Sequence, residues 1–291
     1  MKTVISSIGG WLLMSIGAIL CWVLSFGLSQ ALFKVALPDT GEDPSKTFGL
    51  LFAMLLLEIG VLLWAIRRVE GKKVQLFFTI FSLLFGIQFV MSQIEAWAFQ
   101  SAVGMSSKEM LQTVLGGFLF GLLVAALLVF TQKRKAQVTS GAPLIHLTAG
   151  KVLFLVVMVY PLLYWLAGYF IAWQFQAIRH YYTGAASNEG MVAGFLGFFV
   201  DGLYFLQVGR AFLWFLLAWP FLFYFRGSRL QGALLLGALF SVLHCAQLLL
   251  PNPYMPAEIR YPHLLETASS TFIWGFVMAR VLLGKAERVS Q

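Results

Sequence analysis

The sequence predicts an all-α fold, a bundle of about eight helices that cross a membrane. Of the 291 residues, 60% are hydrophobic and 11% are charged, whereas a soluble domain carries about 25% charged residues. Long apolar runs also recur along the chain, and about 20 such residues span the hydrocarbon core of a bilayer. Both observations indicate a polytopic membrane protein with a single integral membrane domain, residues 1–291.

Eight apolar runs are long enough to be spans. They cover residues 5–33, 48–66, 74–99, 111–131, 152–177, 203–225, 232–250 and 264–284. The first exceeds the apolar core of a cleaved signal peptide and lacks a small-residue cleavage site, so it is interpreted as a retained span. Residues 190–200 are apolar but short, and they predict a half-helix dipping into the membrane or a helix on its surface.

Charged residues in the loops predict the orientation. Alternate loops hold thirteen basic residues, opposed by two acids, Glu70 and Glu287; they are Lys2, Arg67, Arg68, Lys72, Lys73, Lys133, Arg134, Lys135, Lys151, Arg226, Arg229, Lys285 and Arg288. Basic residues collect on the cytoplasmic side of membrane proteins. This alternation fits eight crossings in a bacterial inner (plasma) membrane, with both termini cytoplasmic. The loop at 132–151 would divide the chain into halves of four spans.

The net charge of +8 does not indicate nucleic-acid binding, because the basic residues flank apolar runs and no binding motif is visible. Membrane lipids are the expected partners, and no protein partner is identified. Cys21 and Cys245, both in apolar runs, provide neither a disulfide framework nor a metal ligand set. No phosphate-binding loop, dinucleotide fingerprint or HExxH motif occurs. No cofactor and no metal are therefore expected.

One arginine lies inside an apolar run. Arg210 falls within residues 203–225, and a charge in hydrocarbon must be paired or wetted by a cavity. Glu58 lies about ten residues into its span, roughly 15 Å deep at helical rise, and either Glu58 or Glu95 could pair with Arg210. The sequence leaves open whether such a pair is structural or functional.

Polar residues recur at the predicted outer ends of several spans, and we expect them to line an extracytoplasmic cavity in the outer half of the membrane. Gln207, Arg210 and Trp214 share one helix face, and Arg260, His263 and Glu266 are spaced by three along one helix flank. The candidates are Glu95, Arg179, His180, Tyr182, Gln207, Arg210, Trp214, Arg260, His263 and Glu266. The alternative is that these residues form no site and only lie at the membrane–water interface, where aromatic residues form a belt and arginines contact headgroup phosphates.

Two resemblances carry limited functional information. Phe240-x-x-x-His244 is similar to the F-x-x-x-H spacing of CAAX-type intramembrane proteases, which also have about eight spans. Those enzymes need an earlier E-E-x-x-x-R, but residues 205–209 before Arg210 contain no glutamate. Protease activity is therefore not expected, and His244 is interpreted as a hydrogen-bonded core histidine.

The second resemblance covers mainly the C-terminal half. Three groups of residues resemble an uncharacterised family of bacterial multi-pass membrane proteins. They are YFIAWQ at 169–174 followed by Arg179 and Tyr182; Arg210 with Trp214; and PNPYMP at 251–256 followed by Arg260, His263 and Glu266. That family has no assigned activity, so the resemblance implies only that these residues belong together.

The leading functional hypothesis is a protein that handles a lipid or a small anionic amphiphile from the outer leaflet. Arg179, Arg210 and Arg260 would hold the headgroup, with His180, Tyr182, Gln207 and Trp214 as further ligand contacts; Glu95, His263 and Glu266 would be the catalytic groups. One alternative is a proton-coupled transporter in which Glu58 titrates. Another is a non-catalytic membrane subunit or sensor. The sequence does not decide whether the protein is an enzyme.

Overall fold

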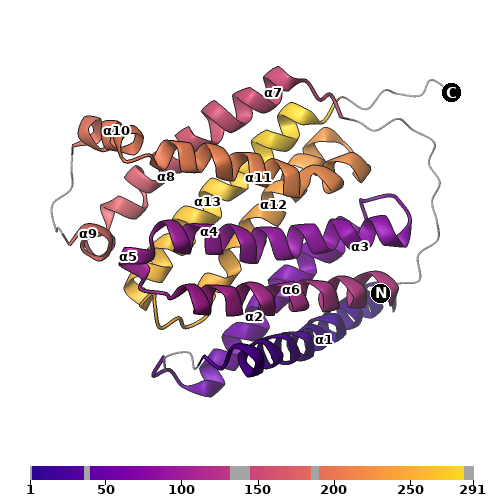
Figure 1. The fold of residues 1–291 in the computed structure, drawn as a ribbon. Helices are drawn as coiled ribbons and strands as arrows, with labels where there is room; N and C mark the ends of the chain where they lie inside the picture. The colour runs from indigo at the N-terminus through magenta and orange to yellow at the C-terminus, as the bar shows by residue number, and fades with distance from the viewer. Residues whose placement is uncertain (1, 36–39, 132–144, 185–189, 285–291) are drawn as a thin grey trace.

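The computed structural model describes residues 2–35, 40–131, 145–184 and 190–284, and these segments form helices and connecting loops without strands (Figure 1). The first half contains α1 (Lys2–Phe33), α2 (Pro44–Ile66), α3 (Lys73–Phe81), η1 (Ser82–Val90), α4 (Met91–Ala98), α5 (Gln100–Val103) and α6 (Ser107–Phe130). The second contains α7 (Ala149–Leu153), η2 (Phe154–Val159), α8 (Tyr160–Phe170), η3 (Ala172–Gln174), α9 (Gln176–Thr183), α10 (Met191–Val200), α11 (Leu203–Tyr224), α12 (Arg229–Cys245), η4 (Ala246–Leu249) and α13 (Ala257–Leu282).

Seven helical segments are long and apolar enough to cross a membrane, and the chain is therefore a multi-pass membrane protein. They are Ile8–Phe33, Pro44–Ile66, Lys73–Ala98, Ser107–Phe130, Ala149–Gln174, Leu203–Tyr224 and Arg229–Leu249. Each corresponds to one predicted span. The short apolar run before Leu203 forms α10, a ten-residue helix. The predicted loop charges at Lys133, Arg134, Lys135, Lys285, Glu287 and Arg288 lie outside the described residues.

The eighth predicted span does not meet the same criteria. Helix α13 has 26 residues, but it includes Glu258, Arg260, Glu266 and Arg280, which lower its hydropathy. It nevertheless packs along α12 more extensively than any other pair of described helices does. Two glycines allow this approach: a Cβ on Gly275 would lie 2.5 Å from the carbonyl oxygen of Leu236, and one on Gly237 would lie 2.8 Å from that of Phe272.

Two membrane segments contain a stretch of π-helix, η1 in the third segment and η2 in the fifth. Such stretches are rare and frequently occur at functional sites. The apolar pattern of these segments did not predict them. Carbonyl oxygens of η1 accept hydrogen bonds from α12 and η4: His244 of α12 contacts the oxygen of Ile87 and Gln247 of η4 contacts that of Gln88, both at 3.2 Å. The third segment is thereby joined to α12.

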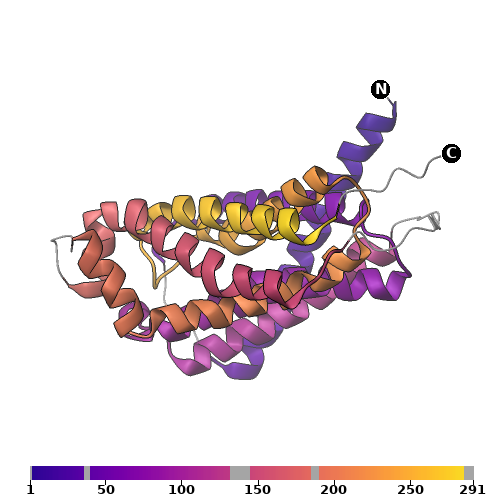
Figure 2. The same ribbon diagram turned by 90° about the horizontal axis from the view of Figure 1, so that it is seen from above.

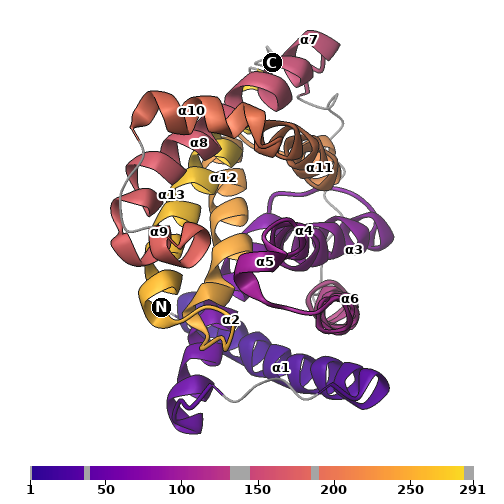
Figure 3. The ribbon, with the colours of Figure 1, turned by 60° about the vertical axis from the view of Figure 1, so that its left-hand side comes forward.

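The bundle has two distinct ends. Figure 1 shows the start of α1 and the ends of α2, α6, α11 and α13 on one side, and α5, α9 and α10 on the other. At the first end the backbones of Val69 and Phe225 pair, as do those of Ile145 and Leu283. Seen from above, α13 runs the length of the bundle (Figure 2). Figure 3 shows α12 and α13 between α1 and α2 at one edge and α8–α10 at the other.

Candidate functional site

An ion pair between Glu95 and Arg210 is the centre of the site. Glu95 comes from α4 and Arg210 from α11. The guanidinium donates from Nη2 to Oε2 at 3.0 Å and from Nη1 to Oε1 at 3.3 Å, a bidentate geometry that adds directionality to the charge attraction. Only 2% of the Arg210 side chain is exposed, against 35% of Glu95. The partner of the buried arginine is therefore Glu95, and Glu58 lies elsewhere.

Residues of α11 and α8 surround the Arg210 guanidinium and hold it in place. Gln207 Oε1 accepts a hydrogen bond of 3.0 Å from Arg210 Nη1. Trp214 Nε1 donates to Tyr160 Oη at 3.2 Å, and the Tyr164 ring lies 5.9 Å from the guanidinium carbon, within the range of a cation–π contact. Gln207, Arg210 and Trp214 are all buried. The three residues lie on one face of α11, as their spacing predicts, and their functional role remains a prediction.

His244 of α12 approaches the ion pair from the other side. Its Nδ1 lies 3.2 Å from the carbonyl oxygen of Ile87, and a carbonyl oxygen only accepts, so Nδ1 carries the hydrogen. In the neutral ring Nε2 is then an acceptor, and it lies 3.8 Å from Oε2 of Glu95. That distance exceeds a hydrogen bond. Two acceptors therefore face each other across this gap, and one water molecule beside it can donate a hydrogen to each.

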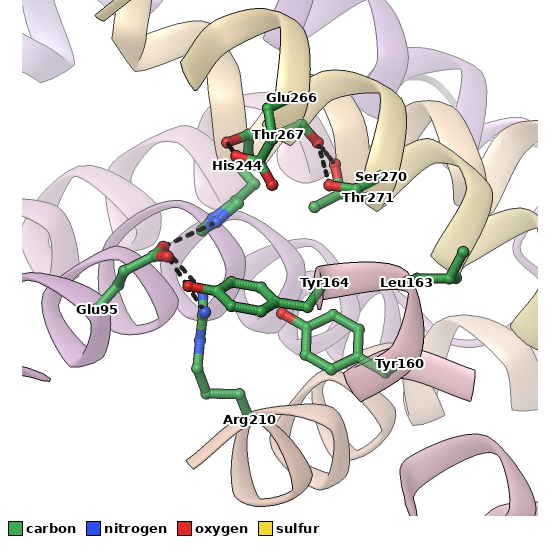
Figure 4. Close-up of a pocket in the computed structure, with 10 residues that line it drawn as sticks. All are labelled: Glu95, Tyr160, Leu163, Tyr164, Arg210, His244, Glu266, Thr267, Ser270 and Thr271. Atoms are coloured by element: carbon green, nitrogen blue, oxygen red, sulfur yellow. Dashed lines mark hydrogen bonds and ion pairs between the residues drawn. The ribbon is translucent and has the colours of Figure 1, made fainter. Parts of the chain in front are cut away.

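A cavity of the corresponding size lies beside this gap. Five helical elements contribute its lining (Figure 4), which consists of Glu95, Tyr160, Leu163, Tyr164, Arg210, His244, Glu266, Thr267, Ser270 and Thr271. Its volume for water is about 20 Å³, and one water molecule needs roughly 10–15 Å³ on that measure. The cavity thus has room for about one water molecule and is too small for a lipid headgroup.

A second polar chain leads from the cavity to α9. Glu266 of α13 lines the cavity, and its Oε2 accepts a 3.2 Å hydrogen bond from Thr267 Oγ1. The same oxygen lies 3.5 Å from His263 Nδ1. Nε2 of His263 lies 3.0 Å from the hydroxyl oxygen of Tyr182. Burial raises the pKa of Tyr182, so this hydroxyl stays protonated at neutral pH.

The polar residues that were predicted to line one cavity fall into two groups in the structure. Glu95, Gln207, Arg210, Trp214 and Glu266 gather at or behind the cavity, and His263 and Tyr182 adjoin it. The other three candidates lie outside its lining: Arg179, His180 and Arg260. For Arg179 and His180 the reason is local: Phe175 has extended backbone angles, φ −87° and ψ 123°. The chain therefore turns before α9 instead of continuing along the fifth segment.

These three residues have contacts of their own. Arg179 Nη1 donates to the carbonyl oxygen of Trp173. Arg260 is 3% exposed, donates to the carbonyl oxygen of Met255 at 3.4 Å, and lies 5.4 Å from the Tyr261 ring. His180 lines a second, open pocket of about 400 Å³ together with Glu258. None of the three therefore contacts the cavity, and their predicted role as headgroup ligands remains a prediction.

Glu58 forms a separate buried site. It is 1% exposed, and its Oε1 accepts a hydrogen bond of 2.8 Å from Gln88 Nε2. Its Oε2 has no hydrogen-bond partner among the described residues. Gln88 belongs to η1, the π-helical stretch whose carbonyl oxygens also bind His244 and Gln247.

Sequence reasoning missed several members of the cavity. His244 is a buried, hydrogen-bonded histidine as predicted, but it also faces the carboxylate. Its F-x-x-x-H spacing was the available signal, and it was set aside because no glutamate precedes Arg210. The glutamate comes from α4 instead, 115 positions away. No pattern pointed to Tyr160, Tyr164, Ser270 and Thr271.

No group of three or more His, Cys, Asp and Glu side chains among the described residues is arranged to hold a metal ion. Comparison with protein-family models, curated protein sequences and solved structures gives no match to this chain. The geometry of the cavity therefore carries the functional argument by itself.

Proposed function

We propose that the protein is a membrane-embedded hydrolase that uses one water molecule to cleave an ester or amide bond of a lipid or similar amphiphile. The observation that supports this proposal is the 3.8 Å gap between two proton-accepting atoms, Glu95 Oε2 and His244 Nε2. The gap lies beside a cavity with room for about one water molecule. A water molecule there can donate one hydrogen to each acceptor, which leaves its oxygen lone pairs directed toward the cavity.

The chemistry follows from this placement. Glu95 accepts a proton from the water as the water oxygen forms a bond to the acyl carbon, and the carbonyl π electrons move to its oxygen. When the tetrahedral intermediate collapses, the bond to the leaving group breaks, and that group takes the proton from Glu95. Arg210 holds both carboxylate oxygens and therefore fixes the direction of the proton transfer, a positioning role.

An amphiphilic substrate fits the setting of the cavity. Glu95 lies three residues before the end of α4, about 5 Å from it at helical rise. A third of its side chain is exposed. The polar cavity itself is too small for a headgroup, so the cleaved bond must reach it from outside the bundle. A substrate already dissolved in the surrounding lipid meets that requirement.

The orientation belongs to the same proposal. We take α13 as an eighth crossing, because it runs between the two ends of the bundle (Figure 1) and its 26 residues cover about 39 Å at helical rise. The described basic loop residues Arg67, Lys72, Lys151 and Arg226 then adjoin one side, which we assign to the cytoplasm of a bacterial cell. Glu95 and Arg210 would lie nearer the opposite, outer face of the inner membrane.

The test measures water incorporation. Purified protein in nanodiscs is offered phospholipids and acylated peptides in water labelled with oxygen-18, and released acids are examined by mass spectrometry. The wild type is expected to give labelled acid, and Glu95→Gln to lose at least about 100-fold in rate, as loss of a general base does. Absence of labelled product from every ester and amide offered would contradict the proposal.

Two controls separate chemistry from folding. Glu42→Gln makes the same change at an exposed glutamate that pairs with Lys46, and it should leave the rate unchanged. Glu95→Gln combined with Arg210→Gln removes the ion pair without leaving a buried charge. If the pair were only structural, the double variant would regain both stability and activity; the proposal expects it to regain stability alone.

One observation supports a second candidate, proton-coupled transport through Glu58. This carboxyl has a single hydrogen bond and no cationic partner among the described residues, an arrangement that suits a group which binds and releases a proton. Proteoliposome uptake driven by a pH gradient, lost in Glu58→Gln and retained in Glu95→Gln, would favour transport over hydrolysis.

A further inference from the structure

We propose that His263 shuttles protons between the cavity and the outer face of the membrane, with Glu266 as the inner partner and Tyr182 as the outer one. The inference rests on the proposed function, because hydrolysis of an ester at neutral pH releases a proton that must leave the buried site. The two contacts of the imidazole ring carry the argument.

The imidazole of His263 is engaged on both sides. Nδ1 lies 3.5 Å from Oε2 of Glu266, which lines the cavity, and Nε2 lies 3.0 Å from the hydroxyl of Tyr182. Tyr182 belongs to α9, which lies outside the seven apolar segments. An imidazole can accept a proton on one nitrogen and release one from the other. His263 thus joins the cavity to a helix at the end of the bundle.

Aromatic side chains enclose the outer contact. The Phe99 ring lies 5.4 Å from the Tyr182 ring in an edge-on arrangement, and the Trp173 ring lies 6.3 Å from it. The Tyr182 and His263 rings are themselves 5.6 Å apart and nearly perpendicular. These contacts fix the hydroxyl toward Nε2 and displace water from its sides, so a proton passes along the chain rather than around it.

The steps balance in protons. Glu266, as the carboxylic acid, gives its proton to Nδ1 of a neutral His263 ring that carries hydrogen on Nε2. The ring then gives the Nε2 hydrogen to the Tyr182 oxygen, while Tyr182 releases its own hydroxyl hydrogen to outside water. One proton has left, and Glu266 is a carboxylate. The ring is left with its hydrogen on Nδ1. Rotation about the Cβ–Cγ bond turns this N–H away from Glu266, and proton exchange with outside water then returns the ring to the tautomer with hydrogen on Nε2.

The charged and titratable groups around His263 favour this direction. Glu266 adjoins it on α13, Tyr182 faces it from α9, and Glu95 acts on the same cavity from α4 with Arg210 of α11 as its partner. Arg260 lies one turn earlier on α13 and is buried. The carboxyl groups thus lie on the cavity side of the ring and the tyrosine on the outer side, which is the order that the transfer uses.

The test needs no substrate. Protein in nanodiscs receives a rapid drop in external pH, and infrared absorption follows protonation of buried carboxyl groups. His263→Gln, which keeps hydrogen-bonding capacity but cannot shuttle, is expected to slow the protonation at least about tenfold with an unchanged final amplitude. Tyr182→Phe should slow it as well. Added imidazole should restore the rate in His263→Ala, which leaves space at the ring.

Matched controls lie next to these residues. His180→Gln and Tyr181→Phe make the same changes on α9, where Tyr181 donates to the carbonyl oxygen of Tyr254, and neither should alter the rate. An unchanged rate in both His263→Gln and Tyr182→Phe would overturn the shuttle. Because the readout is proton uptake, slow uptake in these variants without any hydrolysis product would refute the proposed function and leave the shuttle standing.

Discussion

Glu95 and Arg210 are 115 positions apart in the sequence and form a bidentate ion pair. The side chain of Arg210 is 2% exposed. Removing one partner of such a pair leaves an uncompensated charge. We predict that Glu95→Leu, which leaves the buried Arg210 without its partner, lowers the free energy of unfolding by about 3–5 kcal/mol, measured by thermal or denaturant unfolding in detergent. Glu95→Leu combined with Arg210→Leu should recover most of this loss. Wild-type stability in the single variant would contradict the buried pair.

The buried carboxyl of Glu58 gives a second prediction. Gln88→Leu removes its one hydrogen-bond donor and should cost about 1–3 kcal/mol of unfolding free energy, because a buried polar group is left unsatisfied. Glu58→Gln preserves shape and an acceptor oxygen, so its melting temperature should stay near that of the wild type. A large loss in Glu58→Gln would instead show that the charge of Glu58 is needed for folding.

Helix packing inside the monomer gives the third prediction. A Cβ on Gly117 of α6 would lie 2.2 Å from Cγ of Phe89 in η1, so the two helices pack closely at this glycine. Gly117→Ala is expected to destabilise by about 1–3 kcal/mol through overpacking. Gly209→Ala is the matched control in α11, since nothing lies within 4 Å of its added methyl. That change should be neutral or stabilising, and equal melting temperatures for both variants would argue against the packing.

The start of α2 gives a pH-dependent prediction. Asp43 Oδ1 accepts hydrogen bonds of 2.8 Å from the backbone nitrogen and the hydroxyl of Ser45, and these bonds lower the pKa of Asp43 below its ordinary value of 3.8. The cap is therefore complete above pH 3.8 and is lost as the pH falls through the lower native pKa. Hydrogen-exchange protection of residues 45–47 should drop in that window.

Asp43→Asn provides the control for this cap. Asparagine is also a good N-cap but does not titrate, so the pH step in protection should disappear. Glu42→Gln, one residue earlier, should retain the step. If Asp43→Asn kept the step, another group would be responsible for it.

The sequence predicted the helices better than it predicted their contacts. Seven of the eight expected spans meet the criteria of length and hydropathy, because an apolar run of bilayer length has few alternatives to a membrane helix. Span 264–284 corresponds to α13, in which Glu266 and Arg280 lie within the expected span and lower its hydropathy.

The site was predicted in part. Arg210 was identified because a charge in an apolar run is costly, and Glu95 was one of two possible partners. The choice between Glu95 and Glu58 depends on how each helix is rotated about its axis. The π-helical stretch η1, which contains Gln88 and precedes Glu95, changes this rotation along the third segment. Likewise, the turn at Phe175 removes Arg179 and His180 from the cavity. Local patterns do not contain these rotations.

The two backbone pairs at one end of the bundle have a mechanical consequence. Val69 pairs with Phe225, and Ile145 pairs with Leu283; hydrogen bonds of 2.7 Å and 2.8 Å, from Arg226 to Arg68 and from His146 to Leu282, reinforce the two connections. Loops far apart in the chain are thus fastened together there. The cavity is lined by Glu95, which lies near the end of α4, and Figure 1 shows α5, α9 and α10 at the end opposite the two pairs. If the proposed hydrolysis takes place, the bundle is expected to widen for a substrate at the end that these pairs do not join.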